Sequence, residues 1–288
     1  MSYQEIAYAV MKEFLTDFTE EELKTCINNA YDSKFDTEEI AVTKKVDGAY
    51  YLELFHGATI AFKDMALSLL PHLMTLSLKQ LKEDREVMIL AATSGDTGKA
   101  ALEGFKDVEG TCIKVFYPLD GVSAIQQQQM VSQEGKNVKV VGIHGNFDDA
   151  QSAVKVAFGD KMLKEVSDQH HVFLSSANSI NVGRLIPQIV YYFHSYFELV
   201  RNKEIEMGDQ VNFCVPSGNF GNITAGLFGK KMGLPVKRFI AANNRNDIFY
   251  QYLQTGKYNS RPSIATIANA MDVGDPSNFA RVLDLYGN

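Results

Sequence analysis

Apolar and polar positions follow two rhythms along most of the chain. From residue 87 onward, short apolar runs alternate with stretches in which apolar residues recur every three or four positions. The first pattern is typical of buried strands and the second of amphipathic helices. The apolar runs predict strands at 87–92, 112–117, 138–143, 172–175, 211–215 and 238–242. The periodic stretches predict helices at 98–105, 123–134, 147–166, 180–201, 223–232 and 247–253. Strands that alternate with helices predict a mostly parallel sheet covered on both faces.

The first 85 residues follow other patterns. The first 45 look helical, and Thr19 with Glu22 fits a capping box that opens a helix. The turn Asp47-Gly48 lies within residues 46–55 and predicts a short hairpin. Leucines and methionines at helical spacing predict a helix over residues 65–82.

Composition narrows the class of protein. The chain has 288 residues, 45% of them hydrophobic, so it can bury a sizeable core as one large domain or two smaller ones. Its net charge is −7 and it has no basic tract, so we expect no nucleic-acid partner. The three cysteines are scattered without a CxxC pair and indicate free thiols in a reducing compartment. We see no secretory signal and no apolar run long enough for a membrane span, so we expect a cytoplasmic protein without a membrane partner.

Lys63 is the first candidate for chemistry. It ends the apolar stretch Ala58-Thr59-Ile60-Ala61-Phe62 and precedes a helical run. Low-dielectric surroundings favour the neutral amine of a lysine, which is the nucleophile that a Schiff base requires. A solvated lysine at a helix start is the alternative interpretation of this residue alone.

A glycine-bearing loop follows the predicted strand 211–215 and has the sequence Ser217-Gly218-Asn219-Phe220-Gly221-Asn222. Glycines let the backbone curl and expose consecutive N–H groups, and the next helix adds its positive end. The loop therefore suits a phosphate, although it lacks the G-x-G-x-x-G pattern of dinucleotide-binding proteins. An ordinary tight turn before a helix is the alternative.

A second such loop, residues 93–98, follows the predicted strand 87–92. Thr93, Ser94 and Thr97 offer hydroxyls, and Gly95 and Gly98 are expected to offer accessible N–H groups, which suits a carboxylate or another small anion. A P-loop is excluded, because that motif needs a glycine at position 93 and Ser or Thr at position 100. Asp96 has either a chemical role or the role of a helix N-cap.

Further polar side chains gather where the predicted helix 180–201 begins. Asn178, Asn181 and Arg184 form this cluster, and Arg184 is able to bind a phosphate with two hydrogen bonds. The alternative is helix capping and a surface arginine. Residues 126–129, four glutamines, are interpreted as a solvated helix face. The six histidines and three cysteines show no metal-ligand spacing, so we expect no metal site, and no G-x-S-x-G motif appears.

Taken together, these segments resemble the threonine synthase family, pyridoxal-phosphate enzymes of fold type II. The resemblance is carried by residues 56–64, 91–98, 178–184, 216–222 and 269–279 and extends through essentially the whole chain. It implies an α/β fold like that of the tryptophan synthase β subunit, with parallel sheets covered by helices. The expected parts are an N-terminal helical region (1–45), a small α/β domain (86–174) and a large cofactor-binding domain (46–85 with 175–288).

The resemblance also implies a function. Lys63 matches the Schiff-base lysine, and Gly218, Asn219, Phe220, Gly221 and Asn222 match the loop for the phosphate of pyridoxal 5'-phosphate. The implied reaction converts O-phosphohomoserine and water to threonine and phosphate, by γ-elimination and β-addition. Thr93, Ser94, Gly95, Asp96 and Thr97 are expected to hold the substrate carboxylate, and Asn181 and Arg184 are candidates for the substrate phosphate.

Members of this family continue beyond the point where the present sequence ends. The resemblance therefore implies that the large domain is incomplete and that the group facing the pyridine nitrogen of the cofactor is missing. From this we expect the 288-residue chain to bind the cofactor weakly or not at all, to turn over little or no O-phosphohomoserine, and to associate, for example as a homo-oligomer. The alternatives are another pyridoxal-phosphate lyase or β-replacement enzyme, an inactive relative that only binds phosphate, and a non-catalytic α/β interaction protein.

Overall fold

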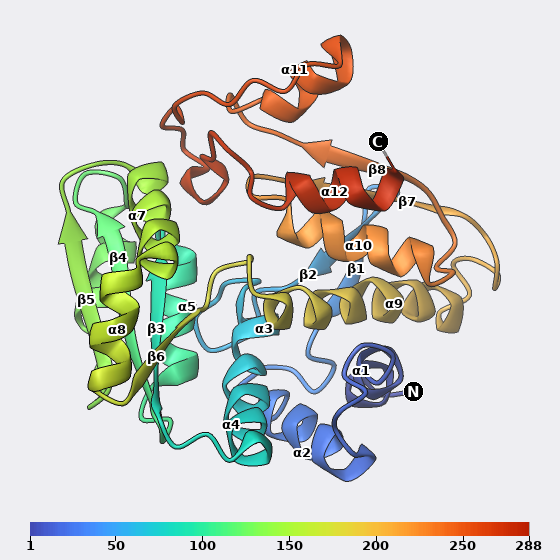
Figure 1. Cartoon of the computed structure of the whole chain (residues 1–288). Coiled ribbons are helices and arrows are strands. Elements are labelled where there is room, and N and C mark those ends of the chain that lie inside the picture. Colours follow the sequence, from blue (N-terminus) through green and yellow to red (C-terminus); the bar gives the residue numbers. More distant parts are fainter. Residues whose placement is uncertain (288) are drawn as a thin grey trace.

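Two parallel sheets, an antiparallel hairpin and the helices around them make up the computed structural model, which describes residues 1–287 (Figure 1). The strands are β1 (Val42–Val46), β2 (Ala49–Glu53), β3 (Glu86–Ala92), β4 (Thr111–Pro118), β5 (Val138–Ile143), β6 (Val172–Ser176), β7 (Val211–Pro216) and β8 (Val236–Ala242). The helices are α1 (Tyr3–Met11), α2 (Glu20–Ala30), α3 (Asp64–Leu67), α4 (Leu70–Leu81), α5 (Asp96–Phe105), α6 (Ala124–Val131), α7 (Phe147–Gly159), α8 (Lys161–Gln169), α9 (Ile186–Arg201), α10 (Gly221–Lys231), α11 (Ile248–Thr255) and α12 (Phe279–Tyr286). Two short 3-10 turns are η1 (Val182–Arg184) and η2 (Asn269–Met271).

The larger sheet has four parallel strands in the order β5-β4-β3-β6. Its helices lie on both faces, with α5 on one side and α7 on the other (Figure 1). Successive residues of β3 point to opposite faces, so Val87, Ile89 and Ala91 join the core under α5, whereas Leu90 and Ala92 pack against α7. The predicted parallel sheet, covered on both faces, is confirmed.

The order of the strands creates a crevice beside β3. The chain proceeds from β3 to β4 and β5 on one side and then returns to place β6 on the other side. Loops that leave neighbouring strands in opposite directions open a space at the carboxyl ends, where ligands bind in open α/β sheets. The loop 93–95 after β3 and the segment 177–181 after β6 border this space.

The smaller sheet pairs β7 with β8 in parallel, and α10 connects them. Helix α9 runs between α1 and α10 (Figure 1), and its apolar residues join one core with the N-terminal helices. Gly226 of α10 permits a close approach, because a Cβ there would lie 2.6 Å from Phe239 and 2.8 Å from Tyr192.

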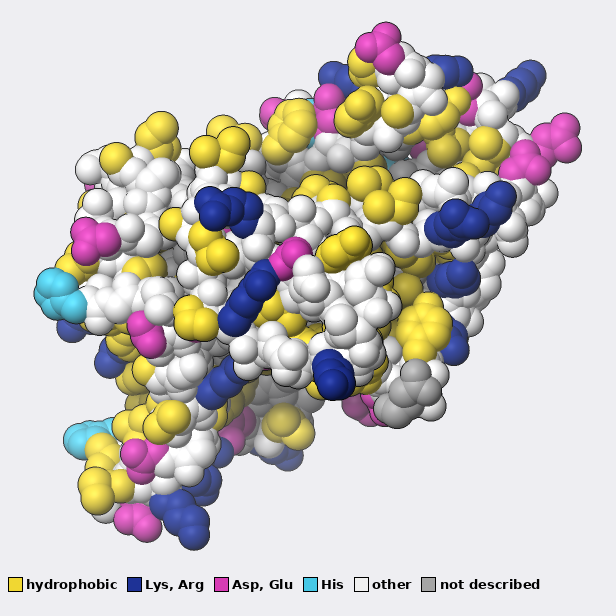
Figure 2. Space-filling model, turned by 90° about the horizontal axis from the view of Figure 1, so that it is seen from above, with side chains coloured by type: hydrophobic (Ala, Val, Ile, Leu, Met, Phe, Trp, Pro, Cys, Tyr) yellow, Lys and Arg dark blue, Asp and Glu magenta, His cyan; other side chains and the backbone are white. Residues whose placement is uncertain are grey.

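Within residues 1–287, β8 pairs only with β7, and a groove lies between β8, α10, α11 and α12. Exposed side chains line this groove, among them Ile240, Tyr250, Leu253 and Tyr286. Figure 2 looks onto the side of the molecule that carries α11 and α12, and hydrophobic side chains are spread across it. Among the helices of residues 1–287, none combines the length and apolar character needed to cross a bilayer.

Two predicted helices are divided in two, and a third begins later than predicted. The helix expected at 65–82 is divided into α3 and α4, because Pro71 has no N–H to continue the helical ladder. The helix expected at 147–166 ends at Gly159, and Asp160 caps a new helix by accepting from the N–H groups of Met162 and Leu163. The helix expected at 180–201 begins only at Ile186, after η1.

The N-terminal part agrees in outline. The Thr19–Glu22 capping box is present, with both reciprocal hydrogen bonds. Helical structure nevertheless ends at Ala30 rather than continuing to residue 45, and β1 already begins at Val42. The hairpin has the predicted Asp47-Gly48 turn but begins at Val42, four residues before the predicted start of the hairpin at residue 46.

Candidate active site

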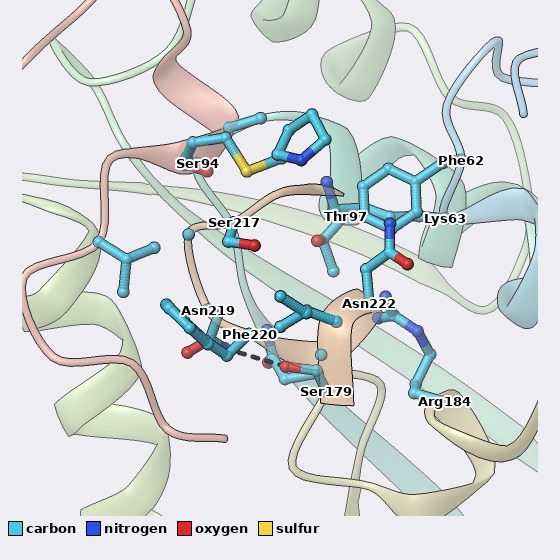
Figure 3. Close-up of a pocket in the computed structure, with 18 of the residues that line it drawn as sticks. Phe62, Lys63, Ser94, Thr97, Ser179, Arg184, Ser217, Asn219, Phe220 and Asn222 are labelled. Atoms are coloured by element: carbon cyan, nitrogen blue, oxygen red, sulfur yellow. Dashed lines mark hydrogen bonds between the residues drawn. The ribbon is translucent and has the colours of Figure 1, made fainter. Parts of the chain in front are cut away.

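One cavity brings together segments that are far apart in the sequence (Figure 3). The predicted site residues that line it are Lys63, Ser94, Thr97, Arg184, Gly218, Asn219, Phe220, Gly221 and Asn222. They come from the segment before α3, from the loops after β3 and β7 with the first residues of the helices α5 and α10 that follow, and from η1. Thr93, Gly95, Asp96 and Asn181 are not part of the lining.

Asp64 fixes the backbone that presents Lys63. Its buried carboxylate accepts hydrogen bonds from the Thr59 N–H at 2.8 Å and the Thr59 hydroxyl at 2.6 Å. A Cβ at Gly57 would lie 2.5 Å from Cβ of Asp64, so only glycine lets the chain wrap this side chain. Burial raises the pKa of Asp64. The 57–59 loop therefore folds around the residue directly after the lysine and holds the start of α3.

The Lys63 amine lies in surroundings that favour its neutral form. The side chain is 11% exposed, and Nζ is 4.5 Å from the centre of the Phe62 ring. Burial lowers the pKa of Lys63, and the Arg184 guanidinium lowers it further, whereas the carboxylate of Asp96, 3.3 Å away, opposes both effects. The alternative of a solvated lysine is wrong. A buried amine with a lowered pKa is suited to nucleophilic attack.

Asp96 touches Lys63 without lining the cavity. Gly95 is the N-cap of α5 and Asp96 is the first helical residue, so the N-cap alternative is wrong. Its second carboxylate oxygen accepts from the Gln126 side chain at 2.7 Å, and Gln126 in turn accepts from Asn269 of η2 at 2.8 Å. Burial alone would raise the pKa of Asp96, but Lys63 and Gln126 lower it. Gln126 is half-buried, so a fully solvated glutamine face is also wrong.

The loop 217–222 presents unpartnered N–H groups to the cavity. Phe220 has φ +65°, and the helix α10 begins directly after it. Within the described part of the chain, no protein acceptor receives the N–H groups of Gly218 to Asn222. These five groups are called the backbone cradle below. Consecutive amides at the positive end of a helix form an anion site.

Neighbouring segments hold the backbone cradle from outside. The Asn219 side chain donates to Ser179 at 2.9 Å and accepts from the Ser277 N–H at 2.7 Å. A Cβ at Gly218 would lie 2.8 Å from Cα of Met271, so η2 packs directly on the loop. The Ser217 hydroxyl donates backwards to the carbonyl of Val215 at 2.8 Å. The shape of the loop is therefore fixed without use of its own N–H groups.

The loop 93–98 is closed on itself. The buried Thr93 hydroxyl accepts from the Gly95 N–H at 2.9 Å and from the Gly98 N–H at 2.8 Å. The prediction that Gly95 and Gly98 offer accessible N–H groups is therefore wrong. Ser94 and Thr97 still face the cavity and remain candidates for an anionic group of a substrate.

The cluster at 178–184 serves two different purposes. Asn178 pairs with the backbone of Ala92, and Asn181 donates to Ser176 and accepts from Gly183, so both side chains are used in local structure. Arg184 is 3% exposed and lines the cavity, so the surface alternative is wrong. Burial lowers its pKa to about 10, and its Nε has no protein partner within residues 1–287. A buried cation without a carboxylate partner fits an anionic ligand.

Several lining residues were not predicted as part of the site. They include Phe62, Phe147, Asn178, Ser179, Gln188, Met271 and Val273. The segment 269–279 contributes to the family resemblance, but its sequence assigns it no role in the site. Residues that reach a cavity from a distant segment leave no periodic signal in the sequence. Across residues 1–287, no group of three metal-ligating side chains occurs.

Comparison with known proteins defines the class. A family profile described as pyridoxal-phosphate dependent enzyme matches residues 40–288, and one described as threonine synthase N terminus matches residues 1–31. A solved structure of pyridoxal-phosphate-bound threonine synthase from Brucella melitensis superposes with a TM-score of 0.85 at 39% identity, over 98% of this chain and 58% of that one. The chain has the fold type II architecture of pyridoxal-phosphate-dependent enzymes.

Full-length relatives narrow this further. Threonine synthase of Saccharomyces cerevisiae is 37% identical over 98% of this chain and 56% of its own length. The Haemophilus influenzae threonine synthase is 41% identical over 84% of this chain and 54% of its own length. The chain belongs to the threonine synthase family. It spans a little over half the length of these curated relatives.

Proposed function

We propose that this chain catalyses a step of threonine biosynthesis, the conversion of O-phosphohomoserine and water to threonine and phosphate, with pyridoxal 5'-phosphate as cofactor. One observation carries the proposal: a buried lysine amine and a row of unpartnered N–H groups face the same cavity. Family membership supports the choice of substrate.

The residues present fit this cofactor. The backbone cradle, Gly218 to Asn222, would hold the phosphate, and the Lys63 amine would bind the aldehyde carbon covalently. When bound, pyridoxal phosphate supplies an electron sink for the carbanions of the reaction. Gly218 has no room for a side chain beside Met271, so close contact between backbone and ligand is built into the loop.

The other cavity residues would bind substrate and transfer protons. Ser94 and Thr97 offer hydroxyls for the substrate carboxylate, and Arg184 offers a guanidinium for its phosphate. Once substrate is bound, the Lys63 amine removes protons at the α and β carbons and returns one at the α carbon, a role that burial favours because it lowers the pKa of the amine and so raises its neutral fraction. The phosphate leaves from the γ carbon with the bonding electron pair, and a proton adds to that carbon to complete the methyl group of threonine. Water adds its hydroxyl at the β carbon, and its other proton goes to the released phosphate.

A labelling experiment tests the assignment of Lys63. The protein is mixed with pyridoxal phosphate, reduced with borohydride, digested and mapped by mass spectrometry. We expect the reduced cofactor on Lys63, and none on any lysine in Lys63→Ala. A label on a different lysine of the wild-type chain would show that the assignment is wrong.

A second experiment tests the reaction. Phosphate release from O-phosphohomoserine is measured with cofactor in excess, and formation of threonine is followed in the same samples. Any turnover should give phosphate and threonine in equal amounts, and Lys63→Ala should give neither product. A different reaction would be assigned to the same active site if Lys63 is labelled, neither product forms, and another β- or γ-substituted amino acid is turned over.

A further inference from the structure

Asn222 ends the backbone cradle, and its side-chain oxygen is held by two tyrosines of α9. The Tyr191 hydroxyl lies 2.6 Å from Oδ1 of Asn222, and the Tyr192 hydroxyl lies 2.7 Å from the same atom. The Tyr192 hydroxyl is also 3.1 Å from the Asn222 carbonyl. Two donors on one amide oxygen are more than the turn before a helix requires.

These hydroxyls act as donors. Both tyrosines are at most 2% exposed, and burial raises the pKa of Tyr191 and of Tyr192, so each keeps its proton. Tyr191 also lies 3.1 Å from Oε1 of Gln188, but a hydroxyl has one hydrogen, and the contact with Asn222 is the shorter one. Both hydroxyl hydrogens are therefore directed to the Asn222 oxygen.

The orientation of the Asn222 amide determines whether its oxygen or its nitrogen is available to a ligand in the cavity. With Oδ1 occupied, the Nδ2 group of Asn222 is left, and it donates to no protein atom in the part of the chain that the structure describes. Asn222 and Arg184 line the same cavity, and both appear in Figure 3. Gln188 connects Arg184 with Tyr191, because its side chain donates to the Arg184 carbonyl and its Oε1 lies beside the Tyr191 hydroxyl.

We propose that Tyr191 and Tyr192 are positioning residues that turn the Asn222 amide so that Nδ2 and the Arg184 guanidinium together bind an oxyanion of a phosphorylated ligand. The inference rests on the proposed function and deepens it. It replaces Asn181, whose side chain is used locally, with Asn222 as the amide partner of Arg184. The backbone cradle supplies N–H groups, and this pair adds side-chain donors next to them.

Inorganic phosphate is the probe, and its affinity is measured by calorimetry for the full 288-residue chain. Either hydroxyl alone can hold Oδ1, so we expect Tyr191→Phe and Tyr192→Phe each to weaken binding by about twofold or less. The double variant should weaken it by about tenfold, as should Asn222→Ala, because a hydrogen bond to a charged group is lost. In the Asn222→Ala background, the two tyrosine changes should have no further effect.

Tyr196→Phe is the matched control. Tyr196 lies on the same helix, is equally buried, and accepts from the Gly208 N–H at 2.8 Å, away from the cavity. Its loss should lower thermal stability without changing phosphate affinity. Asn222→Asp is a second variant in case the double variant does not fold: it keeps an acceptor for both hydroxyls but replaces Nδ2 by a charged oxygen, and should weaken phosphate binding at least tenfold.

The outcomes separate two failures. No phosphate binding by the wild-type chain, together with no label on Lys63, would contradict the proposed function. Normal phosphate binding by the double variant, or by Asn222→Asp, would overturn the positioning role alone. The same is true if the tyrosine changes weaken binding equally in the presence and absence of the Asn222 side chain, since their effect would then be structural.

Discussion

Two glycine-bearing loops leave parallel strands and enter helices in this chain, at 93–98 and at 217–222, and they use their N–H groups in opposite ways. In the first loop the Thr93 hydroxyl accepts two N–H groups of the loop itself. In the second loop the Ser217 hydroxyl donates back to the strand, and the backbone cradle stays unpartnered in the described residues. A glycine loop at a strand end is therefore an anion site only if no nearby side chain occupies its N–H groups.

The largest effect is expected from Thr93→Val, which removes the hydroxyl that closes the first loop. Two buried N–H groups would lose their acceptor, which costs about 2–5 kcal/mol in the free energy of unfolding. Urea denaturation measures the change, and Thr93→Ser, which keeps the hydroxyl, is the control. A loss below about 1 kcal/mol would mean that the two loops do not differ as described.

The next effect is expected from Gly218→Ala in the second loop. A methyl group there would lie 2.8 Å from Cα of Met271, a backbone atom that cannot move alone. Either η2 or the backbone cradle must shift, and we expect phosphate affinity to fall about 10- to 100-fold, in line with the usual cost of overpacking. Gly159→Ala is the control, since a methyl group at that position would have no atom within 4 Å. Equal phosphate affinity in both variants would contradict close packing at the loop.

Asp96→Asn sharpens the comparison between the loops. Asp96 belongs to the first loop, and within residues 1–287 it is the only residue that forms an ion pair with Lys63. The carboxylate favours the ammonium form, so its removal should lower the pKa of Lys63 further. A larger neutral fraction at pH 7 should then give severalfold faster acylation of Lys63. Competitive acylation and mass spectrometry, with the exposed Lys164 as internal reference, measure this rate between about pH 6 and 11. An unchanged pH profile would show that the ion pair does not control the amine.

The smallest effect is expected from Ser217→Ala. Its hydroxyl makes one hydrogen bond to the Val215 carbonyl, so stability should fall by about 1 kcal/mol or less. Phosphate affinity should stay within about twofold of wild type, because no N–H group of the backbone cradle depends on this hydroxyl. Denaturation and calorimetry on the same sample test both statements. If Ser217→Ala lowered the free energy of unfolding by several kcal/mol, as expected for Thr93→Val, the two hydroxyls would contribute equally to stability and the proposed difference between the loops would be wrong.

The sequence was informative where the signal is local. The apolar runs located every strand of the two parallel sheets, and the turn residues located both glycine loops. Lys63 and the 218–222 loop were identified from their local context and prove to line one cavity. Pro71 is also a local signal, and it explains why α3 and α4 are separate helices. The regular spacing of apolar residues over 65–82 nevertheless led to the prediction of a single helix.

What the sequence did not provide are partners brought together by the fold. Thr93 and Ser217 look alike in sequence, and only the tertiary structure shows which hydroxyl accepts and which donates. In the same way, Asn178, Asn181 and Arg184 form one polar cluster in the sequence. In the structure both asparagine side chains are used in local hydrogen bonds, whereas Arg184, whose Nη1 donates to the Ala177 carbonyl, keeps its Nε without a protein partner within residues 1–287. Side-chain hydrogen bonding depends on the distance to other segments, and neither periodicity nor composition contains that distance.

The unpartnered amides of the backbone cradle also have a consequence for hydrogen exchange. An amide in a strand or helix must first break a hydrogen bond before its proton exchanges with water, whereas the amides of Gly218 to Asn222 have no such bond to break. In deuterated buffer they should form a short fast-exchanging segment that extends from the end of the protected strand β7 through the first two residues of helix α10. A ligand that receives these N–H groups would slow their exchange, so occupancy of the site can be measured peptide by peptide even when no catalysis occurs.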